Sequence, residues 1–367
     1  MYDRFGLVLM VTHACNLHCS YCYTGGKRSG SMRRGVGRAA IGRAVRSISP
    51  GGVLELGFFG GEPLLEAQRI ADLVKHAEDL CREASIGLQL DITTNGTLCD
   101  GAAWDVMTMP GMRVTVSHDG LPQVHDRHRR CRNRRGTSQR VIATVRRLLD
   151  AGHDIGVNMV VRPDSVARLP EGIAWLRDQG VRHINTELDL WADWDRAAAR
   201  RLQESLAGCA DLWLAGLPDW NISWYDEKAA RLAGVGISET ARCGFGDGEI
   251  AVAPSGNFYP CERLIGDDAA DNPMRLPGHV LEGRDFCHTD APKRIDANCT
   301  SCTIHDQCNT TCRCSNYVRT GDVDRPDGLL CLLDKTLYRE TARVLFHAAN
   351  LTAQADGNEQ VMALYQS

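Results

Sequence analysis

The sequence has little that would place the protein in a membrane or on a nucleic acid. No apolar stretch approaches the roughly 20 residues that span a bilayer, and no secretion signal precedes the first apolar run. The formal net charge is only -4 over 367 residues, which gives no bulk attraction to nucleic acid or anionic lipid. Repeats and low-complexity tracts are also absent. We therefore expect a cytoplasmic globular protein with no nucleic-acid and no membrane partner.

Cysteine, in contrast, is in excess. The chain has 16 cysteines, and its 43% of hydrophobic residues is ample for a globular core. Thiols in a reducing cytoplasm do not form lasting disulfides, so this number indicates metal or cluster ligands. Five cysteines lack any ligand-like spacing and are interpreted as small buried hydrophobes: Cys81, Cys99, Cys131, Cys209 and Cys287.

Apolar runs alternate with helical patterns through the first two thirds of the chain. Strands are expected at 7–11, 54–59, 88–93, 113–117, 154–161 and 183–188, with helical patterns at 36–47, 65–84 and 138–151. Neighbouring parallel strands need crossover helices between them. Such strands are buried on both faces, so they are continuous apolar runs in the sequence. Six such units in about 235 residues therefore predict an α/β fold with a parallel, partly closed barrel.

The remainder of the chain has a different composition. A helix-rich stretch at 191–215 leads to a region, from Cys243 onward, in which cysteine, glycine and aspartate dominate. This composition is typical of a small domain held together by clusters. We expect three parts: a barrel with bridging helices at 1–235, a cysteine-rich domain at 236–335 and a C-terminal helical segment at 336–367.

Three cysteines directly follow the first predicted strand, which is where a β/α barrel places its chemistry. Cys15, Cys19 and Cys22 have the spacing C-x3-C-x2-C. A four-iron cluster normally takes four thiolates, so a compact triplet requires either a distant fourth ligand or an exchangeable one. A zinc knuckle or buried thiols are the alternative, although zinc sites favour paired C-x2-C spacings and a closing fourth ligand.

This spacing resembles the radical S-adenosylmethionine (SAM) superfamily, and the resemblance implies a partial (β/α)6 TIM-like barrel in which the triplet holds a [4Fe-4S] cluster that binds SAM. Gly60-Gly61-Glu62-Pro63 is similar to the superfamily element that holds the SAM amino group, with a plain tight turn as the alternative. Ser117-His118-Asp119-Gly120, followed by His125-Asp126-Arg127, resembles anaerobic sulfatase maturases and related peptide-modifying enzymes. The SAM-contacting residues implied are Tyr21, Tyr23, Gly60, Gly61, Glu62, Asn95, Ser117, Asn158 and Leu188. For the two tyrosines, ordinary packing is the alternative.

A second cysteine array resembles the seven-cysteine SPASM pattern. The resemblance implies two auxiliary [4Fe-4S] clusters, three clusters in all, with Cys299, Cys302, Cys308 and Cys331 at the outer one and Cys243, Cys261 and Cys312 at the inner one. Seven thiolates leave the inner cluster one ligand short. We favour Cys314 as that ligand, the alternative being an open iron that binds substrate. A pair of zinc ribbons is the alternative for the whole array.

Two charged features could serve the chemistry. Glu262 directly follows Cys261, where sulfatase maturases carry an aspartate implicated in deprotonating the substrate radical, and it is a candidate general base. An ion pair with Arg263 or a surface position is the alternative. The run from Arg127 to Arg135 is the strongest charge block of the chain. It is either a solvated loop or an electrostatic clamp for an acidic peptide.

Together these features predict a radical SAM enzyme. It would cleave SAM reductively to a 5'-deoxyadenosyl radical, with an electron from an external flavodoxin- or ferredoxin-type donor. The radical would abstract hydrogen from a residue of a ribosomally synthesised peptide or a protein, giving a crosslinked or otherwise oxidised side chain. We expect no leader-binding domain before the first strand, so a separate recognition protein, or a substrate that docks on the barrel, is considered.

Other functions remain open at the level of the sequence. Phe59 and Thr24 replace a glutamine and a tyrosine of the sulfatase maturases, which makes formylglycine formation a lesser alternative. A radical dehydrogenase of a small molecule is another enzyme class to consider. An iron-sulfur redox sensor is the non-enzyme alternative.

Overall fold

A single twisted sheet organises the protein. The computed structural model describes residues 1–27, 30–235, 244–286, 296–308 and 312–364. Within these residues, ten strands form one sheet in the order β10-β9-β8-β1-β2-β3-β4-β5-β6-β7. The six strands at its centre are parallel throughout: β1 (Tyr2–Thr12), β2 (Ile48–Gly60), β3 (Gly87–Thr94), β4 (Met112–Ser117), β5 (Ile155–Val161) and β6 (His183–Leu188). The predicted α/β fold with a parallel partial barrel is confirmed.

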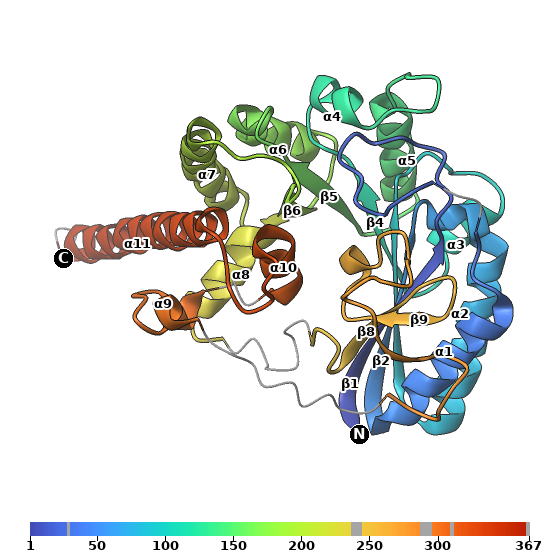
Figure 1. The fold of residues 1–367 in the computed structure, drawn as a ribbon. Coiled ribbons are helices and arrows are strands. Elements are labelled where there is room, and N and C mark those ends of the chain that lie inside the picture. Colours follow the sequence, from blue (N-terminus) through green and yellow to red (C-terminus); the bar gives the residue numbers. More distant parts are fainter. Residues whose placement is uncertain (28–29, 236–243, 287–295, 309–311, 365–367) are drawn as a thin grey trace.

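Helices connect these strands on one side of the sheet, as a right-handed parallel arrangement requires (Figure 1). They are α1 (Arg34–Ser47), α2 (Ala67–Ala84), α3 (Ala102–Met107), α4 (Pro122–His128), α5 (Ser138–Asp150) and α6 (Leu169–Asp178). A short 3-10 turn, η1 (Pro63–Glu66), precedes α2 and takes the first residues of the helix predicted at 65–84. Proline fixes the start of this turn because it needs no hydrogen-bond partner there.

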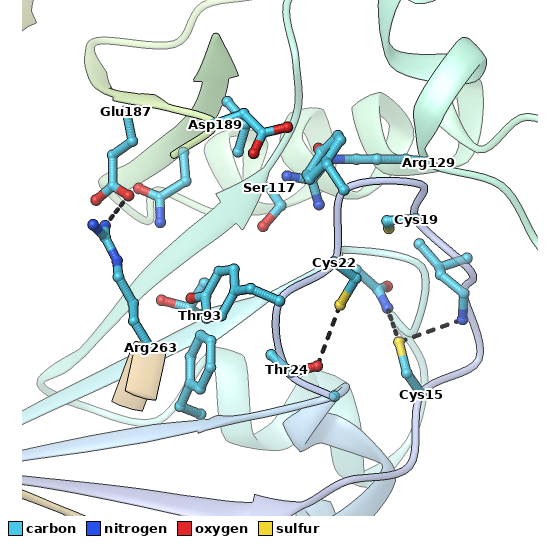
Figure 2. Close-up of a pocket in the computed structure, with 18 of the residues that line it drawn as sticks. Cys15, Cys19, Cys22, Thr24, Thr93, Ser117, Arg129, Glu187, Asp189 and Arg263 are labelled. Carbon is cyan, nitrogen blue, oxygen red and sulfur yellow. Dashed lines mark hydrogen bonds and ion pairs between the residues drawn. The ribbon is translucent and has the colours of Figure 1, made fainter. Parts of the chain in front are cut away.

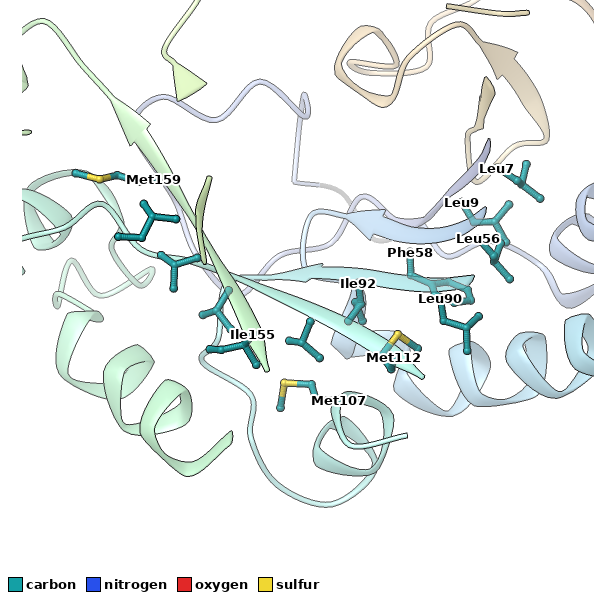
Figure 3. Packing of buried hydrophobic residues seen from close by; sticks show 14 of the residues in the cluster. Leu7, Leu9, Leu56, Phe58, Leu90, Ile92, Met107, Met112, Ile155 and Met159 are labelled. Atoms are coloured by element: carbon teal, nitrogen blue, oxygen red, sulfur yellow. The ribbon is translucent and has the colours of Figure 1, made fainter. Parts of the chain in front are cut away.

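Alternate residues of the central strands form the core between sheet and helices. Leu7 and Leu9 on β1, together with Leu56 on β2, are fully buried in it. Figure 3 shows the same row continuing through Ile92 and Ile155 along the sheet. Because side chains alternate between faces, this register leaves the opposite face of the sheet free to form the inner wall of the barrel.

The cysteine-rich region contributes three strands to the same sheet, which the sequence analysis missed. Strand β8 (Glu249–Val252) pairs in parallel with β1, and β9 (Asn257–Tyr259) and β10 (Leu276–His279) follow it in antiparallel pairs. Strands of three and four residues are too short to show a period of two. Their apolar side chains cover the inner face of β1 at Met10.

A buried arginine fastens this extension to the barrel. The guanidinium of Arg43, on α1, donates hydrogen bonds to the carbonyls of His279 and Asp285 at 3.0 and 2.6 Å. It also lies over the rings of Phe258 and Phe286, 5.0 and 4.8 Å from their centroids. Carbonyls and aromatic faces both favour a cation, so this contact is specific to arginine.

The last helices pack beside the far end of the sheet. After β7 (Asn221–Ile222), α8 (Ser223–Leu232) contacts the long α11 (Gly328–Leu364), which also packs on α7 (Arg196–Gly216). Lys228 of α8 is fully buried, and its Nζ donates to the carbonyl of Gln307 at 2.6 Å and to Asp334 Oδ1 at 3.0 Å. Lys228 therefore joins the cysteine-rich segment to both helices.

The predicted helix at 191–215 begins later, because Asp195 caps α7 by accepting from Ala198 N at 2.6 Å. Helix α11 begins ahead of the predicted boundary at residue 336. The division of the chain at residues 235 and 335 stays a prediction. In the part of the chain that the structure describes, no helix combines the length and the apolarity needed to cross a lipid bilayer.

Candidate active site

The carboxyl ends of β1–β6 surround one cavity of about 1010 Å³, measured to its open mouth (Figure 2). Parallel strands bring their carboxyl ends to one edge, so residues far apart in sequence meet there. Eleven of the predicted site residues line this cavity: Cys15, Cys19, Tyr21, Cys22, Tyr23, Gly60, Gly61, Asn95, Ser117, Asn158 and Leu188. Glu62 and Glu262 are not among the lining residues.

The loop that carries the cysteine triplet is held by backbone hydrogen bonds. His18 N donates to Arg130 O at 2.7 Å and Ser20 N to His128 O at 3.0 Å, on either side of Cys19. Inside the loop, the side chain of Asn95 donates to Asn16 Oδ1 at 2.9 Å. Neighbouring segments of the barrel thus hold the loop in position.

Burial and a neighbouring ammonium act on the pKa values of the three thiols in opposite directions. Burial raises the pKa of Cys19 to about 12, and it also raises the pKa of Cys15. Burial acts in the same direction on Cys22, but the ammonium of Lys27, 2.8 Å from its Sγ, outweighs it and lowers the pKa of that thiol. The charge of Cys22 acts on the pKa of both Cys15 and Cys19, so the three thiols lie close together. If an iron-sulfur cluster bound here, its iron would take the place of the protons that burial holds on the thiols. Three neighbouring cysteines are a ligand set that fits such a cluster.

A buried ion pair supports the same loop, and the sequence analysis missed it. The Tyr21 hydroxyl donates to Asp119 Oδ2 at 2.5 Å, and Arg129 Nε lies 3.1 Å from both oxygens of Asp119. Arg129 also lies over the Tyr21 ring, 5.2 Å from its centroid. Burial and the neighbouring carboxylate raise the pKa of Tyr21 well above its usual value, so the hydroxyl keeps its proton. Arg129 lines the cavity and belongs to the predicted charge block, so one member of that block is neither a solvated nor a surface residue.

The Gly60-Gly61-Glu62 turn joins β2 to the cysteine loop. Gly61 N donates to Thr12 O and Glu62 N to Ala14 O, each at 2.9 Å. A Cβ on Gly61 would lie 2.3 Å from Ala14 O, so only glycine permits this approach of the two backbones. The cysteine loop itself therefore requires Gly61, and the predicted contact of Gly60 and Gly61 with SAM stays a prediction.

Glu62 lies behind the cavity wall. Its carboxylate is fully buried and accepts from Leu64 N at 3.0 Å, Thr94 Oγ1 at 2.8 Å and Asn95 N at 2.7 Å. Burial raises the pKa of Glu62 to about 7 despite these three donors. Its contact with the SAM amino group stays a prediction.

Aromatic and charged groups form the opposite wall, and the sequence analysis did not name Trp191 and Glu187 among them. The Tyr23 ring stacks on Trp191, with 4.8 Å between centroids, and on Phe59 at 6.3 Å. Arg263 lines the cavity and forms an ion pair with Glu187 at the end of β6. Figure 2 shows Arg263 reaching up to Glu187 on the side of the cavity away from Cys15 and Cys19. The sequence held one signal for a cavity role of Arg263: it is a basic residue directly after the predicted base Glu262.

Three cysteines of the predicted inner cluster meet next to this wall. The sulfurs of Cys312 and Cys314 are 3.3 Å apart, and Cys314 also accepts a hydrogen bond from Cys261, which lowers the pKa of Cys314. Cys314 therefore lies where a ligand of the inner cluster would be needed. Cys243 lies outside the described residues, and the ligand set stays a prediction.

Glu262 lies at this inner group. Its Oε2 is 3.5 Å from Cys261 Sγ, and burial raises the pKa of Glu262 to about 7. The sequence analysis considered Arg263 as an ion-pair partner of Glu262, but Arg263 pairs with Glu187 instead.

The predicted outer group lies near α11. Cys302 N donates to Cys299 O at 3.1 Å, and the thiol of Cys331 senses the charges of both residues. Cys308 ends the short turn η5 (His305–Gln307). Among the described residues, no three His, Cys, Asp or Glu side chains converge on a point for a single metal ion. The described cysteines are all free thiols.

The barrel region is similar in sequence to known proteins. Residues 9–186 match the family model described as Radical SAM superfamily. The uncharacterized protein MJ0907 of Methanocaldococcus jannaschii is 28% identical over 182 residues, which cover 50% of this chain and 62% of that protein. The PqqA peptide cyclase of Gluconobacter oxydans is 23% identical over 349 residues, covering 89% of this chain and 90% of that one.

A solved structure shares the fold along nearly the whole chain. The structure described as native anSMEcpe with bound AdoMet and Cp18Cys peptide has a TM-score of 0.77 at 18% identity, covering 95% of this chain and 99% of that one. The family match covers most of the barrel strands whose carboxyl ends surround the cavity. The relatives that align with most of this chain also include the cysteine-type anaerobic sulfatase-maturating enzyme of Clostridium novyi, which is 20% identical over 382 residues, covering 95% of this chain and 97% of that one.

Proposed function

We propose that the protein cleaves SAM reductively to a 5'-deoxyadenosyl radical and uses it to abstract a hydrogen atom from a residue of a ribosomally synthesised peptide or a protein. The observation that carries this proposal is the cavity at the carboxyl ends of β1–β6, with the cysteine triplet on one side and Arg263 on the other. SAM bound beside the triplet and a substrate side chain beside Arg263 would therefore meet in one cavity.

The residues of the first site have distinct tasks in this proposal. Cys15, Cys19 and Cys22 would hold a [4Fe-4S] cluster, which supplies the electron that breaks the sulfonium bond of bound SAM. Ser117, Asn158 and the other lining residues predicted from the sequence would hold SAM. The Tyr21–Asp119–Arg129 group keeps the loop in place, because each of its members is hydrogen-bonded or ion-paired to another.

The downstream cysteines would hold two auxiliary [4Fe-4S] clusters. Cys261, Cys312, Cys314 and Cys243 are the proposed inner ligands, and Cys299, Cys302, Cys308 and Cys331 the outer ones. In this proposal the auxiliary clusters accept the electron that remains after bond formation. Glu262, beside Cys261, is the proposed base that removes a proton from the substrate radical. Full turnover of the Glu262→Gln variant would remove that role.

A peptide substrate is proposed from the relatives. A PqqA peptide cyclase aligns over most of this chain, and the structure of similar fold was solved with a bound peptide. The stacked Tyr23 and Trp191 rings provide a flat apolar wall for a substrate side chain, and Arg263 and Glu187 provide opposite charges beside it. A leader-recognition protein is proposed as a separate partner.

Isotope transfer tests this function. The anaerobically reconstituted full chain is incubated with SAM, dithionite and a candidate peptide deuterated at its side chains. We expect deuterium in the released 5'-deoxyadenosine and a peptide lighter by the hydrogens removed. Unlabelled 5'-deoxyadenosine together with an unchanged peptide mass, across peptides encoded beside this gene, would contradict a peptide substrate.

A further inference from the structure

A short hairpin after α4 gathers exposed arginines beside the cysteine loop. Arg130 and Gly136 pair as an antiparallel bridge, and Cys131 N donates to Arg135 O at 2.9 Å, which closes the hairpin. The exposed arginines on it are Arg130, Arg132, Arg134 and Arg135. We call residues 130–136 the arginine hairpin.

The charge of this hairpin is not neutralised by the protein itself. Its neighbours outside the hairpin are paired, Arg127 with Asp164 and Arg129 with Asp119. Arg130 donates from Nε to the backbone carbonyl of Asp126 at 2.8 Å. Arg132, Arg134 and Arg135 have no carboxylate within ion-pair distance among the residues that the structure describes. Four positive charges in seven residues thus face solvent, on a protein whose net charge is -4.

The hairpin touches the segment that carries the first cysteines. Arg130 O accepts from His18 N at 2.7 Å, and Cys131 bridges Leu17. His18 is itself exposed and precedes Cys19 directly. In Figure 1 the dark-blue cysteine loop lies beside the green segment that joins α4 to α5. A macromolecule bound to the hairpin would therefore lie next to the loop that holds the triplet.

The hairpin does not face the cavity. Of the block from Arg127 to Arg135, only Arg129 lines it, and Arg129 is engaged with Asp119. A clamp for an acidic substrate peptide should point its charges into the substrate cavity. Arg130, Arg132, Arg134 and Arg135 do not line the cavity, and their hairpin contacts the outside of the cysteine loop at Leu17 and His18.

We propose that the arginine hairpin is the docking surface for an acidic one-electron carrier protein. The inference rests on the proposed function, because SAM cleavage needs one electron from outside. The reduced carrier would lose that electron to the site formed by Cys15, Cys19 and Cys22, and no atoms would be transferred. Opposite charges increase the rate at which such partners meet, and contacts of redox partners are small and short-lived.

Neutralising the hairpin tests this surface. The variant Arg132→Gln/Arg134→Gln/Arg135→Gln removes three charges and leaves the backbone bonds of the hairpin intact. The matched control Arg182→Gln/Arg196→Gln/Arg200→Gln removes three exposed arginines elsewhere. The probe is a reduced flavodoxin. Its binding to each protein is measured by fluorescence anisotropy, and SAM cleavage is followed with flavodoxin and, separately, with dithionite.

We expect the hairpin variant to bind flavodoxin about tenfold more weakly than the control at low salt, and to be reduced correspondingly more slowly. Salt near 1 M should remove the difference, because it shortens the screening length to about 3 Å. With dithionite the two variants should cleave SAM equally. Equal flavodoxin binding by both variants would overturn the docking surface, and so would weaker binding of the substrate peptide by the hairpin variant alone. Failure of dithionite to support SAM cleavage in every protein would instead overturn the proposed function.

Discussion

The two cysteine regions of the molecule are held in place by different means. The triplet lies on a loop bound to the barrel through backbone hydrogen bonds, a buried ion pair and the turn at Gly61. The downstream cysteines lie in short turns and at helix starts, and at the inner group the thiols contact one another and the hydroxyl of Ser315. The first region is thus held by many contacts within the barrel. The second would obtain much of its order from the clusters themselves.

Replacing one cysteine in each region should give the largest difference in activity between the two regions. We expect Cys19→Ala to lower 5'-deoxyadenosine formation to background, because the first cluster loses a ligand. Cys314→Ala should retain SAM cleavage and lose the modified peptide. Chromatography of the nucleoside and mass spectrometry of the peptide measure the two outcomes. Loss of SAM cleavage in both variants would show that the regions do not act separately.

Removing the iron should increase local unfolding in the second region and leave the first region unchanged. Structural metals contribute folding free energy, about 10 kcal/mol or more for zinc in small domains. Hydrogen exchange in α10 (Arg313–Thr320) and the turns at 299–308 should therefore accelerate at least about 100-fold after chelation. Amides of β1–β6 should exchange as before. Equal acceleration in both regions would contradict the comparison.

Asp119→Asn should break the support of the first region. The substitution leaves the Arg129 charge buried without its partner, which costs about 3–5 kcal/mol of unfolding free energy. The control Arg113→Gln removes an exposed pair with Asp91 and should cost less than about 1 kcal/mol. Urea unfolding of the iron-free proteins measures both. Similar losses in the two variants would show that the Asp119 pair gives no special support.

Glu62 should make the stability of the first region depend on pH. The folded protein retains the Glu62 proton up to pH about 7, whereas the unfolded chain releases it near 4.5. The unfolded state then binds fewer protons, so stability should fall as pH rises through this interval, by up to roughly 3 kcal/mol. Glu62→Gln should show a fall about half as large, because Glu262 has the same raised pKa, and the exposed control Glu83→Gln should retain the whole fall. Parallel stability profiles for Glu62→Gln and the wild type would contradict the assignment.

Much of the first region was predictable from the sequence, because its signals are local. Continuous apolar runs predicted β1–β6, and the spacing of Cys15, Cys19 and Cys22 predicted the loop. The Asp119–Arg129 pair was not found, since an arginine inside a charged run resembles a solvated one. Strands β8–β10 were missed because they are short and are specified by pairing with β1. Arg263 reaches the cavity only through tertiary packing, which no local pattern encodes.

The most direct test of the account is the fate of SAM on the reconstituted protein. Full-length protein with its clusters rebuilt anaerobically is reduced with dithionite and given SAM. The account predicts equal amounts of 5'-deoxyadenosine and methionine from the wild type, and neither from Cys19→Ala. Intact SAM with fully reconstituted, reduced wild-type protein would contradict the claim that the triplet at the end of β1 generates the radical.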